Sequence, residues 1–141
     1  VRNTGTALYN RDISGEKESF SELAEFLTRF PESQYSPYAK QRSIYLRNMI
    51  ARNELAAADY YITRKAYVAS IRRANYVLEN IPGSSENLRA LKILLVSYEA
   101  LGYSELYEDT KKVIAINYKD LEEPQEESSW FWNSLQNIKP E

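Results

Sequence analysis

Apolar residues recur every three or four positions along this chain, which is the period of a helix with one buried face. In the first half this face comprises Phe20, Leu23, Leu27 and Phe30, and in the second half Tyr67, Ile71, Ala74, Leu78 and Ile81. Proline and glycine interrupt the pattern at Pro31, Pro82 and Gly102. The pattern predicts helices over residues 14–30, 66–81 and 85–101, a last helix from residue 104, and the stub of a helix at residues 6–10.

The stretch from Ser36 to Pro82 has no glycine and no proline between Pro37 and Pro82. A serine followed by proline is typical of a helix start, with serine as the N-cap and proline in the first helical position. Two interpretations fit the rest: one long helix over residues 37–64, or two shorter helices with a break near Asn53. We favour the single helix, because it explains a wide spacing between repeats. We also expect serine N-caps at the other helix starts, namely Ser14, Ser85 and Ser104.

A set of small, aromatic and proline positions recurs along the chain at fixed offsets. The central copy consists of Ala58, Tyr61, Tyr67, Leu78 and Pro82. An earlier copy keeps Ala7, Leu27 and Pro31, and a later one keeps Leu95, Tyr98 and Ala115. This spacing is that of the tetratricopeptide repeat, in which aromatic residues fill the groove between two helices. We therefore predict an all-α solenoid of helix-turn-helix repeats, about three of them, with one lengthened helix.

The composition changes near the C-terminus. Residues 122–129 are acidic and lack apolar periodicity, and they are followed by Trp130, Phe131 and Trp132. We predict a C-terminal tetratricopeptide-repeat domain over residues 1–119, and an acidic linker with an aromatic tail over residues 120–141. Three roles for the tail aromatics stay open: capping the exposed end of the array, contacting a partner, or lying at a membrane interface.

The composition argues against catalysis. The chain has no cysteine and no histidine, which removes thiol nucleophiles, serine–histidine pairs and most zinc sites. Its four glycines are scattered, so no phosphate-binding loop is present. We expect a non-enzymatic protein with no cofactor and no metal. The net charge of −2 also argues against nucleic acid as a partner.

Basic and aromatic residues lie close together in the middle of the sequence. Tyr60 precedes Arg64, and Arg72 and Arg73 follow within the next predicted helix. Arginine and tyrosine are the residue types that dominate protein-docking surfaces, although tyrosine–arginine clusters also bind RNA. The alternative is a solvated face whose arginines pair with Glu54, Asp59 and Glu79. Arg73 lies outside the apolar stripe of its helix, so we expect it to have no task in folding and to serve a partner.

Two segments resemble a known family more closely than the general repeat does. They are Phe20-Ser-Glu-Leu with Phe30-Pro-Glu-Ser-Gln-Tyr35, Ala39 and Arg42, and Ala58-Asp-Tyr-Tyr-Ile-Thr-Arg64 with Ala66, Val68 and Ala69. Residues 9–117 are similar to the C-terminal half of the BamD (ComL) family. These are lipoproteins of the outer-membrane β-barrel assembly machinery.

The resemblance implies five repeats in the full protein, roughly the last three of which are present here. The chain begins at Val1 without a starting methionine, and we expect a piece of a longer protein whose lipid anchor lies in the missing part. The implied location is the periplasmic face of the outer membrane. The implied partners are the periplasmic POTRA region of BamA and accessory lipoproteins of the same complex.

In that family a basic face on the penultimate repeat meets an acidic POTRA surface. Arg64 and Arg73 match two of its arginines, and we add their neighbours Tyr60 and Arg72. The segment from Lys119 departs from the family pattern, so no role is carried over to it. The alternative function is that of another periplasmic repeat adaptor, which would bind peptides or envelope proteins.

Overall fold

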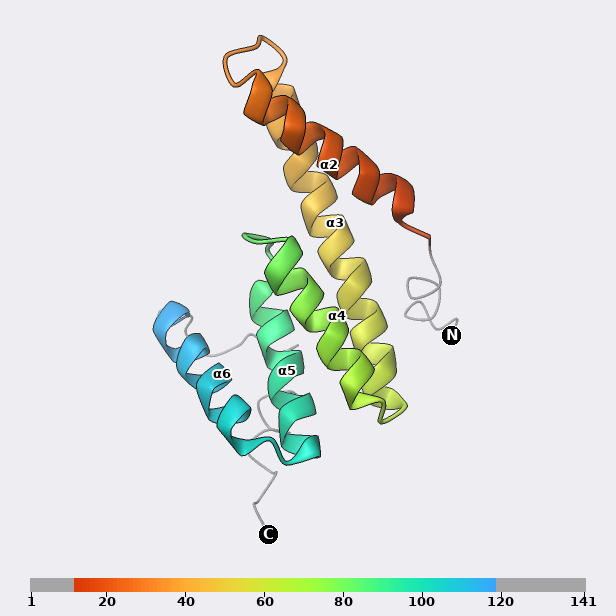
Figure 1. Ribbon diagram of the computed structural model, residues 1–141, viewed down its shortest axis with the longest axis vertical. Coiled ribbons are helices and arrows are strands. Elements are labelled where there is room, and N and C mark those ends of the chain that lie inside the picture. Colours follow the sequence, from red (N-terminus) through yellow and green to blue (C-terminus); the bar gives the residue numbers. More distant parts are fainter. Residues whose placement is uncertain (1–11, 119–141) are drawn as a thin grey trace, which may run out of the picture.

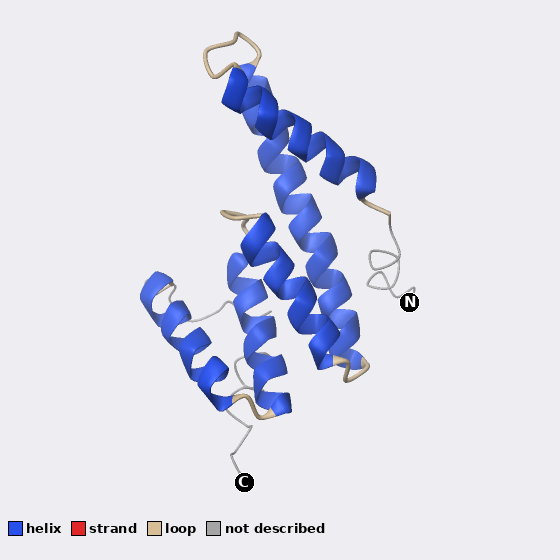
Figure 2. Cartoon of the chain, in the orientation of Figure 1, coloured by secondary structure: helices blue, strands red, loops and turns tan. Residues whose placement is uncertain are grey.

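A computed structural model describes residues 12–118 of the chain, and this part is helical with no strand (Figure 2). The elements are α2 (Ser14–Arg29), α3 (Ser36–Thr63), α4 (Tyr67–Asn80), α5 (Asn87–Leu101) and α6 (Ser104–Asn117). Each helix packs against the next one in sequence, and α3 also contacts α5. The predicted all-α array of helix pairs is confirmed. The helix stub at residues 6–10 and the region 120–141 lie outside the described residues.

The single long helix is also confirmed, because α3 runs unbroken from Ser36 to Thr63. Its N-terminal half lies beside α2, and its C-terminal half lies beside α4 (Figure 1). The helix therefore belongs to two successive helix pairs, one with α2 and one with α4. None of the helices in residues 12–118 is both long enough and apolar enough to cross a membrane.

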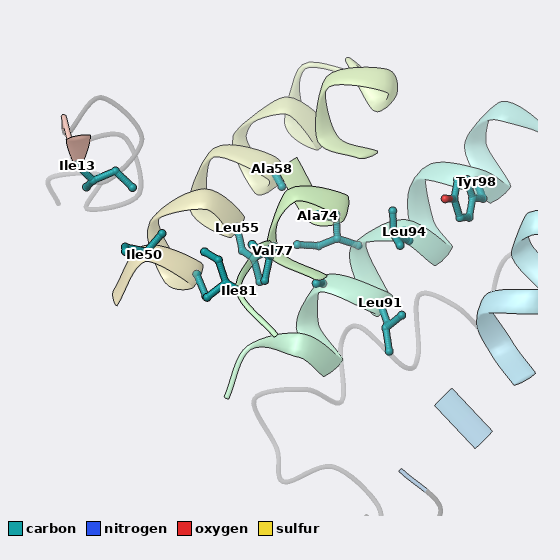
Figure 3. Packing of buried hydrophobic residues seen from close by; sticks show 13 residues of the cluster. Ile13, Ile50, Leu55, Ala58, Ala74, Val77, Ile81, Leu91, Leu94 and Tyr98 are labelled. Atoms are coloured by element: carbon teal, nitrogen blue, oxygen red, sulfur yellow. The ribbon is translucent and has the colours of Figure 1, made fainter. Parts of the chain in front are cut away.

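The hydrophobic core is centred on α3, α4 and α5 (Figure 3). Its fully buried members include Ile50, Leu55 and Ala58 of α3, with Ala74 and Val77 of α4. No residue of α2 is buried, and Thr110 is the one buried residue of α6. The outer helices are therefore held by half-buried side chains, and the stability of the described part depends mainly on the central three.

The predicted buried face of α4 is rotated in the structure. Ser70, Ala74 and Val77 of α4 are fully buried, followed by Ile81 just after the helix, while Ile71 and Leu78 are half-buried. The reason is that α4 packs between α3 and α5, so two flanks are covered instead of one. The small side chains of Ser70 and Ala74 allow both neighbours to approach.

The helix ends agree with the sequence, but the serine caps were predicted wrongly. The prolines 31 and 82 each lie just beyond a helix end, and Gly102 ends α5 with a φ of 74°. None of the helices α2, α3, α5 and α6 has a side-chain hydrogen bond at its N-cap. Ser14, Ser36 and Ser104 are instead the first helical residues, and α5 begins after Ser85, at Asn87.

Hydrogen bonds within the turns replace the predicted caps. The Ser36 hydroxyl donates to the carbonyl of Phe30 at 2.7 Å, which closes the α2–α3 turn. At the start of α2 the Asp12 carboxylate accepts from the Ser14 N–H at 3.0 Å. This contact lowers the pKa of Asp12, because the backbone N–H of Ser14 favours the charged carboxylate.

Candidate protein-docking surface

The corner between α3 and α4 positions the predicted site residues. Two backbone bonds close it: the Lys65 N–H donates to Ile62 O at 2.9 Å, and the Ala66 N–H donates to Tyr61 O at 2.8 Å. Lys65 takes the left-handed conformation, with a φ of 58°. This is the Schellman arrangement that ends many helices. It ends α3 at Thr63, with Arg64 as the C-cap, and places the start of α4 beside the last turn of α3.

The same pair of bonds closes the corner between α5 and α6. There the Gly102 N–H donates to Glu99 O at 3.1 Å, and the Tyr103 N–H donates to Tyr98 O at 2.9 Å. Gly102 thus occupies the position of Lys65 one repeat later. The two turns that are equivalent in the predicted repeat therefore also have the same backbone hydrogen bonds.

Tyr60, Tyr61 and Arg64 form a contiguous aromatic and basic surface at the end of α3. The rings of Tyr60 and Tyr61 meet edge to face, with centroids 5.9 Å apart. The Arg64 guanidinium carbon lies 5.2 Å from the centre of the Tyr60 ring. Arg64 itself is exposed, so it rests on the tyrosine while remaining in water.

Arg73 is held by a buried carboxylate, which overturns the expectation that it has no task in folding. Glu54 of α3 is only 2% exposed. Its Oε2 accepts from Nη1 of Arg73 at 2.8 Å, and its Oε1 accepts from Nζ of Lys17 at 2.7 Å. A buried carboxylate needs such partners, because an unpaired charge in the core is strongly destabilising. These three residues, the Glu54 triad, therefore tie α2, α3 and α4 together.

The pKa shifts of the two cations agree with this geometry. Burial lowers the pKa of Lys17, but the hydrogen bond and charge of Glu54 outweigh burial, and the net pKa is raised. The Lys17 ammonium also lies 4.5 Å from the centre of the Tyr76 ring. The hydrogen bond that Arg73 donates to Glu54 is likewise the main reason that the pKa of Arg73 is raised. Both side chains are therefore charged at neutral pH.

The triad and the aromatic surface are connected. Tyr61 lies close enough to Arg73 to help raise the pKa of its guanidinium, after the larger effect of Glu54. The contacts therefore run from Glu54 through Arg73, Tyr61 and Tyr60 to Arg64. Three of the four predicted site residues are brought into one network.

Arg72, the fourth predicted site residue, lies apart. It is exposed, one position from Arg73 on α4, and successive helical residues point in directions about 100° apart. The sequence analysis gave as an alternative that the arginines pair with Glu54, Asp59 and Glu79. The structure shows one such pair, between Arg73 and Glu54. Asp59 instead pairs with Arg89 of α5.

The sequence analysis missed Lys17 and the central role of Glu54. A signal was present for Glu54, which stands among the small and apolar residues Leu55, Ala57 and Ala58 in a segment that the structure buries. Lys17 gave no such signal, because its contact depends on how α2 is placed against α3. The tail residues Trp130, Phe131 and Trp132 lie outside residues 12–118.

The last helix presents a second surface. Leu106, Val113 and Ile116 of α6 are exposed apolar residues, while Tyr107 and Ile114 pack toward the core. Burial and the nearby carboxylate of Glu99 raise the pKa of Tyr107. The solvent-facing side of α6 therefore exposes three apolar residues among its charged ones.

Comparison with known proteins gives a consistent result. A family model described as an outer membrane lipoprotein (YfiO) matches residues 2–113. Among curated proteins, the outer membrane protein assembly factor BamD of Vibrio cholerae is 32% identical over 77% of this chain and 45% of its own length. BamD of Xylella fastidiosa is 34% identical over 80% of this chain and 39% of its own.

A third BamD protein is similar to the chain to the same degree. BamD of Neisseria meningitidis serogroup A is 34% identical over 77% of this chain and 41% of its own length. The chain thus spans less than half the length of these curated relatives. The matched region includes all of the Glu54 triad and all four predicted docking residues.

Proposed function

The chain belongs to the outer membrane lipoprotein family that includes BamD, and from this we propose that it is a non-enzymatic docking scaffold of outer-membrane protein assembly. Its partners in this proposal are the periplasmic POTRA region of BamA and accessory lipoproteins of the same complex. The chain would then act at the periplasmic face of the outer membrane, in a longer protein with a lipid anchor.

The observation that carries the proposal is the network at the α3–α4 corner. It presents two arginines and two tyrosines on one continuous surface, fixed from beneath by a buried carboxylate. Arginine forms short, directional hydrogen bonds with carboxylates, and both residue types are frequent hot spots of protein interfaces. An acidic protein surface is therefore the partner chemistry that this corner fits best.

Binding to the BamA periplasmic region tests the proposal. Arg64→Glu should weaken the complex at least tenfold, because it places a carboxylate where an acidic partner is expected. Arg64 is exposed, so the fold should be unaffected. Lys40→Glu is the matched control, because it makes the same charge change on an exposed residue at the other end of α3. Equal loss from both variants would contradict a local docking site.

Arg73→Glu is informative for a different reason. It would place a second carboxylate against buried Glu54, leaving Lys17 as the only counter-charge of the triad. We expect a loss of about 2–3 kcal/mol in unfolding free energy, less than for a fully buried pair because Arg73 is partly exposed. Urea denaturation measures this, with exposed Arg72→Glu as the control expected within about 0.5 kcal/mol of wild type. Arg73→Glu is thus unsuitable as a binding probe.

The alternative function is a periplasmic adaptor with other partners. A chain that binds acidic peptides or envelope proteins through the same corner, but not the BamA periplasmic region, would favour it. Binding to RNA that depends on Arg64 would contradict both protein-docking functions.

A further inference from the structure

Glu54 is a carboxylate at the centre of a surface expected to attract carboxylates. Counted as an isolated charge, it would repel an acidic partner. The structure buries it beneath Arg73, with each of its oxygens accepting from a different cation. Glu54 can therefore support a docking site for anions only through its effect on the neighbouring cations.

The first contribution is orientation. Arginine has a long side chain, and an exposed one samples many rotamers that binding would have to restrict. Arg73 is restrained in advance by its hydrogen bond to the buried carboxylate of Glu54. Its side chain nevertheless remains 42% exposed. A guanidinium has several N–H donors in a planar fork, so the outward ones remain directed at solvent.

The second contribution comes from Lys17. Glu54 and Arg73 alone would form a neutral pair with little attraction for a further anion. With Lys17 on the other oxygen, the triad has two positive charges and one negative charge, and it stays cationic. The Lys17 side chain is 36% exposed, so part of this charge also reaches the surface.

We propose that Glu54 is a positioning residue of the docking surface: with Lys17, it holds the Arg73 guanidinium in the orientation that receives one carboxylate of an acidic partner. This inference rests on the proposed function and makes α2 part of the docking surface, because Lys17 comes from α2. The partner group is an aspartate or glutamate side chain that approaches Arg73 beside Tyr61.

Glu54→Gln separates positioning from simple charge. If Glu54 only added negative charge, its removal would strengthen binding to an acidic partner. If it positions Arg73, binding should weaken three- to tenfold although the surface becomes more positive. Glu79→Gln is the matched control, since it makes the same change at an exposed position of α4 and should leave affinity unchanged or slightly higher.

The experiment is calorimetric titration of the whole chain with the BamA periplasmic region, combined with circular dichroism melts of each variant. In an Arg73→Met background, Glu54→Gln should cause no further loss of affinity, because its effect acts through Arg73. If Glu54→Gln instead caused a general loss of structure, it would lower the affinity by the same factor in the wild-type and the Arg73→Met chains. Tighter or unchanged binding of Glu54→Gln would overturn the inference and leave the proposed function intact.

Lys17→Met provides a second variant in case Glu54→Gln unfolds. It should weaken binding and reduce the salt dependence of the complex, because it neutralises the triad while leaving Arg73 in place. Unchanged affinity and salt dependence in a folded Lys17→Met chain would also overturn the inference. If the wild-type chain does not bind the BamA region, the proposed function fails, and this inference fails with it.

Discussion

At the scale of single residues, Lys65 carries the clearest local cost. It is the only non-glycine residue between 12 and 118 with a positive φ. The left-handed conformation costs an L-residue roughly 1–2 kcal/mol relative to glycine. Glycine offsets part of this advantage, because it loses more conformational entropy than other residues when the chain folds. The corresponding residue of the next repeat is Gly102, which has no such cost.

Lys65→Gly should therefore raise the unfolding free energy by about 0.5–1 kcal/mol. Urea denaturation followed by circular dichroism measures this change. Gly102→Lys is the reverse variant and should lower stability by a similar amount, since open space surrounds the site and only the backbone conformation opposes it. Equal stability of Lys65→Gly and wild type would mean that Lys65 compensates its backbone cost through its side chain.

A second residue-scale prediction concerns alkaline pH. The pKa of Lys17 is raised in the folded chain, so folding favours its charged form. This stabilisation is fully present below the unfolded pKa of about 10.4, and it is lost as pH rises through the higher folded pKa. Tyrosines ionise in the same range, so the measured quantity is the stability difference between wild type and Lys17→Met. That difference should shrink above about pH 10.5, and a constant difference would contradict the triad.

At the scale of elements, Ala58 tests how tightly α3, α4 and α5 pack together. It is completely buried in the cluster that joins α3, α4 and α5 (Figure 3). Ala58→Leu should cost about 1–3 kcal/mol, because the added atoms would force the helices apart. Exposed Ala100→Leu on α5 is the control, expected to stay within about 0.5 kcal/mol. A thermal melt compares them, and equal midpoints would mean that the site adapts without strain.

The ends of the helices were easier to predict from the sequence than their caps or their buried faces. The prolines 31 and 82 and Gly102 constrain the backbone locally, so the helix ends near them could be predicted without knowing the fold. The caps could not, because the hydroxyl of Ser36 finds its acceptor across the turn at Phe30. The buried face of α4 could be predicted only in part, because periodicity does not say how many neighbours cover a helix.

At the scale of the whole molecule, the sequence indicated which basic and aromatic residues to consider, but not the contacts that connect them. Tyr60 and Arg64 are near in sequence, and they do lie together. The partner of Arg73 comes from another helix, and Lys17 comes from a third, so their meeting depends on the packing of three elements. A hydrophobic pattern specifies which helices are amphipathic, but not which charged groups meet between them.

The aromatic tail gives the last prediction. We expect Trp130 or Trp132 to be buried, on the last helices of this chain or on a partner, since burying a large side chain recovers about 1.5–3 kcal/mol. The exposed apolar residues of α6 offer one surface for it. These are the only two tryptophans, so fluorescence reports on them alone. Blue-shifted emission of the isolated chain would indicate self-capping, and emission that shifts only on adding a partner would indicate binding. Water-like emission in both conditions would refute the prediction.

The unbroken length of α3 has a mechanical consequence. With 28 residues it is a rod of about 42 Å, with the α3–α4 corner at one end and the α2–α3 turn at the other (Figure 1). Such a rod is a lever arm: tilting it by about 5° at the corner moves the far end by roughly 4 Å, given its length. Any tilt of α3 therefore moves the α2–α3 turn, where Phe30 and Tyr35 are exposed, much further than it moves the corner.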